Sequence, residues 1–162
     1  MQSDSRARGA ALALLCLVLG AAAPDERVEP HFGSIRRSET NLREGPSYAH
    51  RILWIYKRKD YPVWVISGFG EWRHVRDVDG TMGWMHHTQL SDRRTVLFAS
   101  HAKSPLREAA DRNGKILAFV APGVVASLKA CEPSMCEVEA QGIDGWADKQ
   151  DLWGVEPGEV FH

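Results

Sequence analysis

Short runs in which apolar and polar positions mix, separated by turn residues, make up most of the chain. The runs lie at 38–42, 52–56, 62–67, 72–78 and 81–85, and Val63-Trp64-Val65-Ile66 within the third is entirely β-branched and aromatic. Such residues favour β-strands. No segment shows the sustained apolar period of a packed helix. The pattern predicts an all-β chain whose strands recur at intervals of about 8 to 12 residues.

The second half of the chain repeats the first with fewer aromatic residues. Strands are expected at 116–120, 124–130, 136–140 and 144–147. The anchors of the repeat are Leu42-Arg43-Glu44 with Leu106-Arg107-Glu108, Gly83-Trp84 with Gly145-Trp146, and Leu90 with Leu152. Their separation falls from 64 to 62 residues along the chain, and we attribute this change to a two-residue deletion in the last hairpin. The repeat predicts two copies of one small fold.

The two copies set the expected domain boundaries. Five short strands in about 60 residues fit a small, partly open barrel better than a sandwich. We expect barrel 1 at 37–98 and barrel 2 at 99–162. Residues 24–36, which contain Pro24 and Pro30, are expected to form a flexible lead-in. In barrel 1, Asp79-Gly80 predicts a tight primed turn, because glycine adopts positive φ at little cost.

The first 23 residues have the features of a secretory signal peptide. Arg6 and Arg8 precede an apolar run at 10–19, and three alanines follow at 21–23. The run is shorter than the roughly 20 residues that a membrane span requires. We therefore expect cleavage near Ala23 and a protein that is exported to the periplasm or secreted, without stable membrane insertion. Cys16 is lost with the signal peptide.

Charge divides the remaining chain into two halves. Without residues 1–23 it has 18 basic and 20 acidic residues, a balance that does not indicate a nucleic-acid partner. Residues 31–98 carry 11 basic and 7 acidic side chains, whereas residues 99–162 carry 6 and 10. The opposite signs could dock the barrels on each other or leave one barrel free to meet an envelope polymer.

Cys131 and Cys136 are the two cysteines that remain after cleavage. Disulfides persist in exported proteins, and the tetrapeptide between the two residues has turn character. We predict a disulfide between them. The alternative is a pair of reduced or reactive thiols. The spacing differs from a CxxC redox motif, and two cysteines without an adjacent histidine make a poor zinc site.

Three motifs carry a family resemblance. They are NLREGPS at 41–47, W-x-x-V at 72–75 and DGTMGWMHHTQL at 79–90. Together they resemble the bacterial Src-homology-3 domain, an SH3-like barrel, and the second half resembles a diverged copy. Tandem pairs of this kind are similar to small exported bacterial SH3-domain-containing proteins. The second copy has Ala109-Ala110 in place of Gly45-Pro46, and Met135 in place of Trp72.

The resemblance implies a binding function. Family members resemble peptidoglycan-targeting modules of cell-wall hydrolases, and others bind proteins. We therefore expect a non-catalytic module of the cell envelope that recognises peptidoglycan or another envelope component. The alternative is an interaction module for an envelope polypeptide. An envelope hydrolase is the least favoured function, because pairing of the cysteines removes the thiol nucleophile and the sequence contains no nucleophile elbow, phosphate loop or paired-carboxylate motif. No cofactor is expected.

The candidate ligand surface lies in barrel 1, which holds most of the aromatic residues. We choose Tyr48, Tyr56 and Trp72 for a shallow groove that could take a glycan strand or an extended peptide. Lys57 and Arg58 could face anionic polymers. The alternative is that the aromatic side chains pack in the ordinary way and the basic run is a solvated turn.

Several repeated residues are expected to be structural. Arg43 and Arg107 occupy the same place in the two copies and could bond turn carbonyls or a carboxylate. Gly83-Trp84 and Gly145-Trp146 are expected to contribute tryptophan to the two cores, with a ligand platform as the alternative. Trp153 should plug the second barrel from outside or lie between the barrels.

A metal site is not expected. His74, His86 and His87 are the candidate ligands. However, adjacent residues at the end of a strand point to opposite sides, so His86 and His87 should not share one ion. No carboxylate spacing completes a ligand set.

Overall fold

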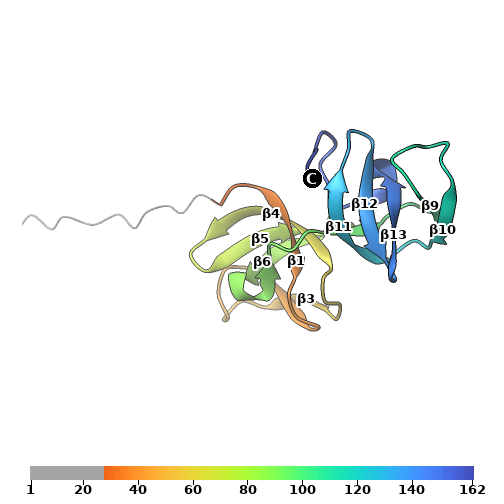
Figure 1. Ribbon diagram of the computed structural model, residues 1–162. Coiled ribbons are helices and arrows are strands. Elements are labelled where there is room, and N and C mark those ends of the chain that lie inside the picture. Colours follow the sequence, from red (N-terminus) through yellow and green to blue (C-terminus); the bar gives the residue numbers. More distant parts are fainter. Residues whose placement is uncertain (1–27) are drawn as a thin grey trace, which may run out of the picture.

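The computed structural model describes residues 28–162, which form two seven-stranded antiparallel sheets one after the other along the chain (Figure 1). The first domain contains β1 (His31–Ile35), β2 (Thr40–Arg43), β3 (Ile52–Tyr56), β4 (Pro62–Phe69), β5 (Trp72–Arg76), β6 (Met82–His86), the 3-10 helix η1 (His87–Gln89) and β7 (Leu90–Ser91). The second contains β8 (Thr95–Phe98), β9 (Ser104–Arg107), β10 (Ile116–Val120), β11 (Val125–Cys131), β12 (Met135–Ala140), β13 (Ile143–Asp148), the 3-10 helix η2 (Lys149–Asp151) and β14 (Leu152–Trp153).

The two sheets have the same strand order. The first runs β3-β2-β6-β5-β4-β1-β7, and the second runs β10-β9-β13-β12-β11-β8-β14. Every strand of one domain therefore has an equivalent in the other, and the predicted tandem all-β architecture is confirmed. Neither sheet closes into a barrel, because β3 and β7 remain edges of the first sheet, as β10 and β14 do of the second.

The hairpin turns differ between the copies, and the first is not the primed turn that we expected. Between β5 and β6, Gly80 has φ 83°, but Asp79 does not have positive φ. The Gly80 N–H donates to the Asp77 carbonyl and the Asp77 N–H donates to the Thr81 carbonyl. This is a three-residue loop in which a left-handed glycine follows a type I turn.

The tight two-residue primed turn is in the second copy. It joins β12 to β13, where Gln141 and Gly142 both have positive φ, at 53° and 81°. Equivalent residues of the two copies are 63 positions apart at Trp72 and Met135, and 62 positions apart at Gly83 and Gly145. The last hairpin therefore loses one residue, not two, and the other residue is lost before β5 and β12.

The first strand of each domain contradicts the predicted boundaries. β1 lies in the supposed flexible lead-in, yet it pairs with both β4 and β7. β8 was assigned to the first barrel, yet it pairs with β11 and β14 of the second sheet. The boundary between the sheets therefore falls at 92–94 rather than after Phe98. Both strands are four or five residues long, and their partners are distant in the sequence, so a local pattern gave little indication of where they pair.

Each domain is held by a core to which every strand contributes. In the first domain this core comprises Ile35, Leu42, Tyr56, Val63, Val65, Val75, Met85 and Leu90. In the second it comprises Val96, Phe98, Leu106, Val120, Ala126, Leu128, Cys131, Cys136, Val138, Ala140, Ala147 and Leu152. Cys131 and Cys136 form the predicted disulfide and face each other across β11 and β12. In the chain-entropy model a loop this short contributes about 2 kcal/mol.

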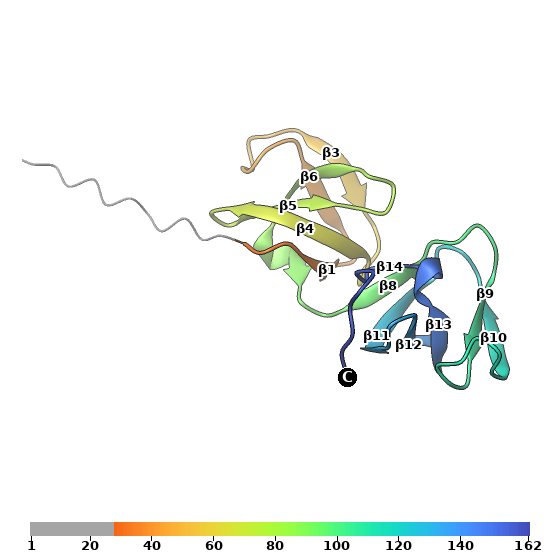
Figure 2. The same ribbon diagram turned by 90° about the horizontal axis from the view of Figure 1, so that it is seen from above.

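Aromatic and arginine side chains join the two domains. Trp153 of β14 packs edge-on against Phe32 of β1, with ring centroids 5.2 Å apart, so it lies between the domains. The guanidinium of Arg76 lies 5.5 Å from the Trp153 ring centroid. The Thr95 hydroxyl donates to the Asp60 carbonyl oxygen at 2.7 Å. Figure 2 shows β8 and β14 on the side of the second domain that faces the first.

The predicted signal peptide, residues 1–23, lies outside the described residues. Within residues 28–162, no helix has the length and apolar character needed to cross a membrane.

Candidate functional site

The three aromatic residues chosen for a shallow groove do not lie together. Trp72 opens β5 and is only 8% exposed, and its ring lies 5.0 Å from that of Tyr48, which is 66% exposed. Tyr56 ends β3 and is 7% exposed. Its aromatic neighbour is Tyr61, at 5.7 Å. The three residues therefore do not form one groove. Exposed Tyr48 packs against buried Trp72, and Tyr56 belongs to a separate region with Tyr61.

Tyr56 is bonded to a buried carboxylate. Its hydroxyl donates to Asp77 Oδ2 at 2.6 Å, and Asp77 Oδ1 accepts from the backbone N–H groups of Asp79 and Thr81. Burial, assisted by the Asp77 carboxylate, raises the pKa of Tyr56 far above its ordinary value. Burial also raises the pKa of Tyr61 to about 12. Both phenols therefore remain neutral donors in the folded protein, and Asp77 fixes the β5–β6 turn.

A groove of about 530 Å³ opens above this pair. Its buried members are Tyr56 and Asp77, and its half-buried or exposed members include Trp54, Lys57, Arg58, Tyr61, Asp79 and Thr81. We call it the Trp54 groove. Trp54 is 59% exposed and offers a flat apolar face with an N–H donor at one edge.

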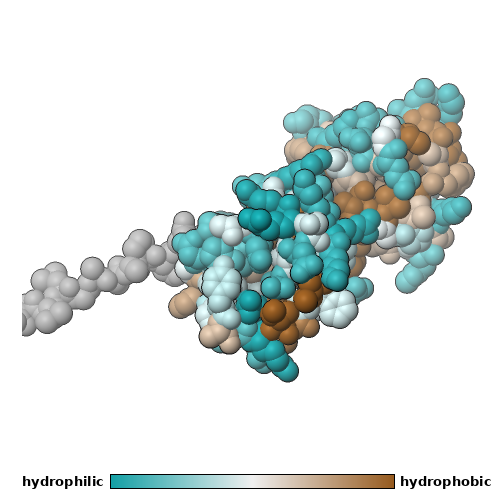
Figure 3. Space-filling view, turned by 90° about the horizontal axis from the view of Figure 1, so that it is seen from below, coloured by the Kyte–Doolittle hydropathy of each residue, from teal (hydrophilic) through white to brown (hydrophobic). Residues whose placement is uncertain are grey.

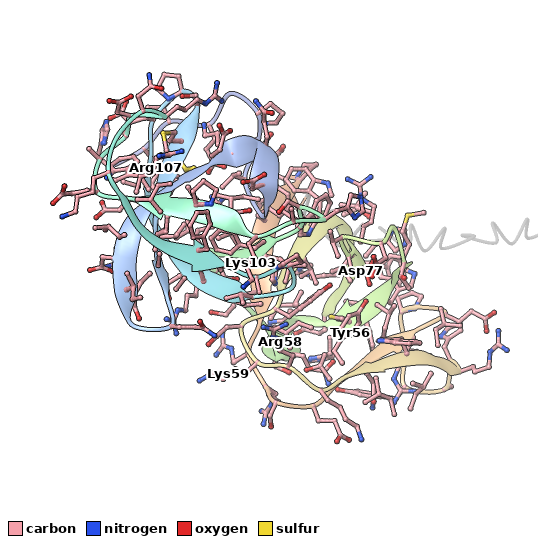
Figure 4. All side chains as sticks on the ribbon, turned by 90° about the vertical axis from the view of Figure 1, so that its right-hand side faces the viewer. Tyr56, Arg58, Lys59, Asp77, Lys103 and Arg107 are labelled. Carbon is pink, nitrogen blue, oxygen red and sulfur yellow. A yellow bond between two sulfur atoms is a disulfide. The ribbon has the colours of Figure 1, made fainter. Side chains whose placement is uncertain are left out.

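The two basic residues predicted for the site have different surroundings. Lys57 lines the Trp54 groove and is exposed. Arg58 also lines it, but its Nη1 donates to the Gly123 carbonyl of the second domain at 2.6 Å. Figure 4 shows Tyr56, Asp77 and Arg58 in the same part of the first domain, and Arg107 away from them in the second. Arg58 therefore takes part in joining the domains, whereas Lys57 makes no ion pair in the part of the chain that the structure describes.

Trp54 and Tyr61 were not among the predicted site residues. Trp54 belongs to β3, an edge strand in which Ile52, Leu53, Trp54 and Ile55 are all more than 40% exposed. An apolar run without polar alternation resembles a buried strand in sequence. The surplus of aromatic residues in the first half was the signal that an aromatic surface exists, but this signal did not distinguish Trp54 from Trp72.

Arg43 and Arg107 both bond turn carbonyls. Arg43 Nη1 donates to the carbonyls of Tyr48 and His50, at 3.1 and 2.8 Å. Arg107 Nη1 donates to the Gly114 carbonyl at 2.7 Å. In each copy the arginine therefore fixes the turn that follows its own strand, and these contacts account for the repeated residue.

In the Gly-Trp pairs, the glycine rather than the tryptophan faces the core. Gly83 and Gly145 are buried, whereas Trp84 and Trp146 are half-buried on the opposite face of their strands. Neither core cluster of the described residues contains a tryptophan, so the expectation of core tryptophans is wrong. The alternation along each strand places residues adjacent to a buried glycine on the outer face. Trp84 stacks there with His74, at 4.9 Å between ring centroids.

The histidine pair also differs from expectation. His86 ends β6, and His87 begins η1, so the strand alternation that would separate them no longer applies. Their ring centroids are 4.9 Å apart. Glu71 supplies the carboxylate that the spacing did not reveal, and its Oε2 lies 2.5 Å from His87 Nε2. Both arguments against an ion shared by His86 and His87, the alternation of side chains and the missing carboxylate, are therefore wrong. His74 lies elsewhere, stacked on Trp84.

The chain was compared with protein families, curated proteins and solved structures. A family model described as "Bacterial SH3 domain" matches residues 36–92 and 101–154. A comparison with curated proteins finds no match. Among solved structures, NlpC2 from Trichomonas vaginalis matches with 13% identity and a TM-score of 0.36, covering 77% of this chain and 48% of that one. NlpC1 from the same organism matches with 15% identity and a TM-score of 0.35, covering 86% and 50%. This chain thus spans about half the length of either structure.

Proposed function

Because the chain belongs to the bacterial SH3 domain family, a family of binding modules, we propose that it is a non-catalytic binding module of the cell envelope. Its ligand is peptidoglycan or another envelope component, and its ligand surface is the Trp54 groove. The single observation that carries the proposal is a groove in which an exposed tryptophan lies beside a lysine that makes no ion pair within residues 28–162.

The groove has the chemistry that a glycan or peptide strand requires. The Trp54 face can stack on a sugar ring or an amide plane, and the Lys57 ammonium can bind a carboxylate. Asp79 is exposed at the rim and can accept hydrogen bonds from hydroxyl, amide or amino groups. Peptidoglycan carries sugar rings, amides, carboxylates and amines, so all three side chains have partners in one polymer. Export through the predicted signal peptide would bring the protein to that polymer.

Cosedimentation with purified sacculi tests the proposal. We expect the wild-type protein to sediment at low salt and to be released as salt rises, because the lysine contribution is screened. Trp54→Ala should weaken retention about 30-fold, the effect of losing a hot spot worth about 2 kcal/mol.

Phe119→Ala is the matched control. Phe119 lies on β10, the strand equivalent to β3, and is 61% exposed, close to the 59% of Trp54. It should leave retention unchanged. Failure of the wild-type protein to sediment would refute the proposal, and so would equal losses in the two variants, because equal losses would indicate adsorption to any exposed aromatic residue.

A second candidate function rests on the two apolar edge strands. β3 and β10 each end a sheet, and each exposes large apolar side chains, among them Ile52, Leu53, Ile116 and Leu117 at 41 or 42%. Figure 3 shows apolar surface on both halves of the molecule. An extended polypeptide can add to such an edge as a further strand. Crosslinking in cells that recovers one envelope protein, with crosslinks lost when Leu53→Lys and Leu117→Lys are combined, would favour this function over glycan binding.

A further inference from the structure

The end of the β5–β6 hairpin brings two imidazoles and a carboxylate together. Trp72 pairs with His86 across the hairpin, and the His87 N–H donates to the Glu71 carbonyl at 2.8 Å. These backbone contacts place Glu71, His86 and His87 side by side. One ligand atom from each of the three lies within 4.8 Å of the others.

The His86 ring is fixed with one nitrogen available. Its Nδ1 lies 2.9 Å from Thr88 Oγ1, while Tyr48 stacks on the ring and Trp72 meets it edge-on. Among residues 28–162, no hydrogen bond to His86 Nε2 is present. In the tautomer whose Nδ1 carries the proton, Nδ1 donates to the threonine hydroxyl and gives up the long 3.4 Å bond that it otherwise accepts from the Thr88 N–H, and Nε2 has a free lone pair. Metal-bound histidines are oriented in this way by a second hydrogen bond.

The second domain has the same backbone without the ligands. The Lys149 N–H donates to the Ser134 carbonyl at 3.0 Å, as His87 does to Glu71. Asp148 caps η2 by accepting from the Gln150 N–H at 3.2 Å. His86 caps η1 in the first domain, with Nδ1 at 3.4 Å from the Thr88 N–H. Aspartate is the better cap, so the fold does not require the histidine.

We propose that Glu71, His86 and His87 bind a divalent transition metal ion, with Zn²⁺ as the best match. Two imidazoles and one carboxylate leave a fourth position open, an arrangement that zinc adopts in proteins. His87 Nε2 and Glu71 Oε2 are 2.5 Å apart, closer than the roughly 3.3 Å between ligands of a tetrahedral ion with bonds near 2.0 Å. Binding therefore replaces this hydrogen bond and separates the two atoms. Their side chains are 44% and 69% exposed, which leaves them room to move.

Cobalt titration tests the proposal directly. Co²⁺ added to the purified protein should give the intense visible absorption of a four-coordinate ion, saturating at one equivalent per chain, and Zn²⁺ should bleach it by displacement. In the triple variant Glu71→Ser, His86→Asp and His87→Lys, affinity should fall at least about 100-fold. Those residues occupy the same backbone in the second domain, so the variant is compatible with the fold, and circular dichroism verifies it.

Two single variants sharpen the test. Thr88→Val removes the partner of His86 Nδ1 and should weaken binding about 10- to 100-fold. His74→Ala removes a histidine that stacks on Trp84 and should leave affinity unchanged. An absence of saturable one-to-one binding, or equal affinity in the triple variant and the wild-type protein, would overturn the proposal. The sacculus assay is a separate readout, because the Trp54 groove does not include these residues.

Discussion

Asp77 shows how one buried carboxylate can organise a turn and a surface together. Asp77 is only 5% exposed. Its carboxylate accepts hydrogen bonds from one hydroxyl and two backbone N–H groups. The backbone donors close the β5–β6 loop, and the hydroxyl ties that loop to the end of β3. The Trp54 groove lies between the two segments that Asp77 joins, so its shape depends on this residue.

Tyr56→Phe should therefore destabilise the first domain. The variant leaves Asp77 Oδ2 without its buried donor, which typically costs about 1–3 kcal/mol. Urea unfolding at pH 7 measures the change. Tyr61→Phe is the control, because no hydrogen bond of the Tyr61 hydroxyl is present among the described residues, and it should cost less.

The wild-type protein and the Tyr56→Phe variant can also be compared at alkaline pH. The pKa of Tyr56 is raised in the folded protein, whereas the unfolded chain ionises near pH 10. The stabilisation from the neutral phenol is thus complete below pH 10 and is lost as pH rises above it. The advantage of the wild-type protein over Tyr56→Phe should shrink above pH 10, and a constant difference up to pH 11 would contradict the assigned hydrogen bond.

Some residue roles could be predicted from the sequence, and others could not. The structural role of Arg43 and Arg107 was predictable, because an arginine stands at the same place in both copies and each one fixes the turn after its strand. Trp72 and Tyr56 were chosen for being aromatic, but aromatic character alone does not say which face of a strand a side chain occupies. Glu71 escaped notice because its partner His87 is 16 positions away and only the hairpin brings them together.

At the scale of elements, the glycine of each Gly-Trp pair allows one strand to cross close to another. A Cβ at Gly83 would lie 2.7 Å from both the Arg43 carbonyl oxygen and Leu42 Cγ. At Gly145 it would lie 2.6 Å from Leu106 Cγ and 2.9 Å from the Arg107 carbonyl oxygen. The β2–β6 and β9–β13 pairings, each made at a single residue pair, require this approach.

Gly83→Ala should destabilise the protein by about 1–3 kcal/mol, the usual cost of overpacking. The obstacle includes backbone, which cannot rotate away as a flexible side chain can. Thermal unfolding measures the loss. Gly158→Ala is the control, since a Cβ there meets nothing within 4 Å, and a similar effect of both substitutions would contradict the crossing as the cause.

The elements themselves were predictable wherever a strand was long or its neighbours were near. The runs at 52–56 and 116–120 match β3 and β10 residue for residue. β1 was missed because Gly33 and Ser34 are weak strand formers. Gly33 lies where β7 passes closely, since a Cβ would be 3.1 Å from the Ser91 carbonyl oxygen. The two residues are far apart in the sequence, so the local pattern did not indicate this contact.

At the scale of the whole molecule, a single ion pair among residues 28–162 joins the two oppositely charged halves of the chain, Arg94 with Glu159, and its arginine lies in the segment between the sheets rather than in the first sheet. Among the described residues, no ion pair links residues 28–91 to residues 95–162. Phe32, Arg76 and Trp153 meet instead through ring packing and a cation–π contact. The domains are therefore expected to remain associated at salt concentrations that screen surface charges.

Trp153→Ala should loosen this association. Loss of an aromatic pair and a cation–π contact is worth about 1–3 kcal/mol together. We expect one thermal transition to separate into two in calorimetry and the radius of gyration to increase in solution scattering. Trp146→Ala, on the outer face of the second domain, should leave the association intact. If both variants keep a single transition and the wild-type radius, the contact does not hold the domains together.

The contacts of Arg94 indicate an order in which the two domains fold. Its guanidinium makes two hydrogen bonds to the Glu159 carboxylate, 65 positions later, and another to the Gly154 carbonyl. The first sheet, by contrast, draws all its strands from residues up to Ser91. As the chain is synthesised, the first domain can complete its sheet at once, while the contacts of Arg94 wait for the last residues. We therefore expect folding to run from the first sheet to the second, with the C-terminal segment packing against Arg94 last.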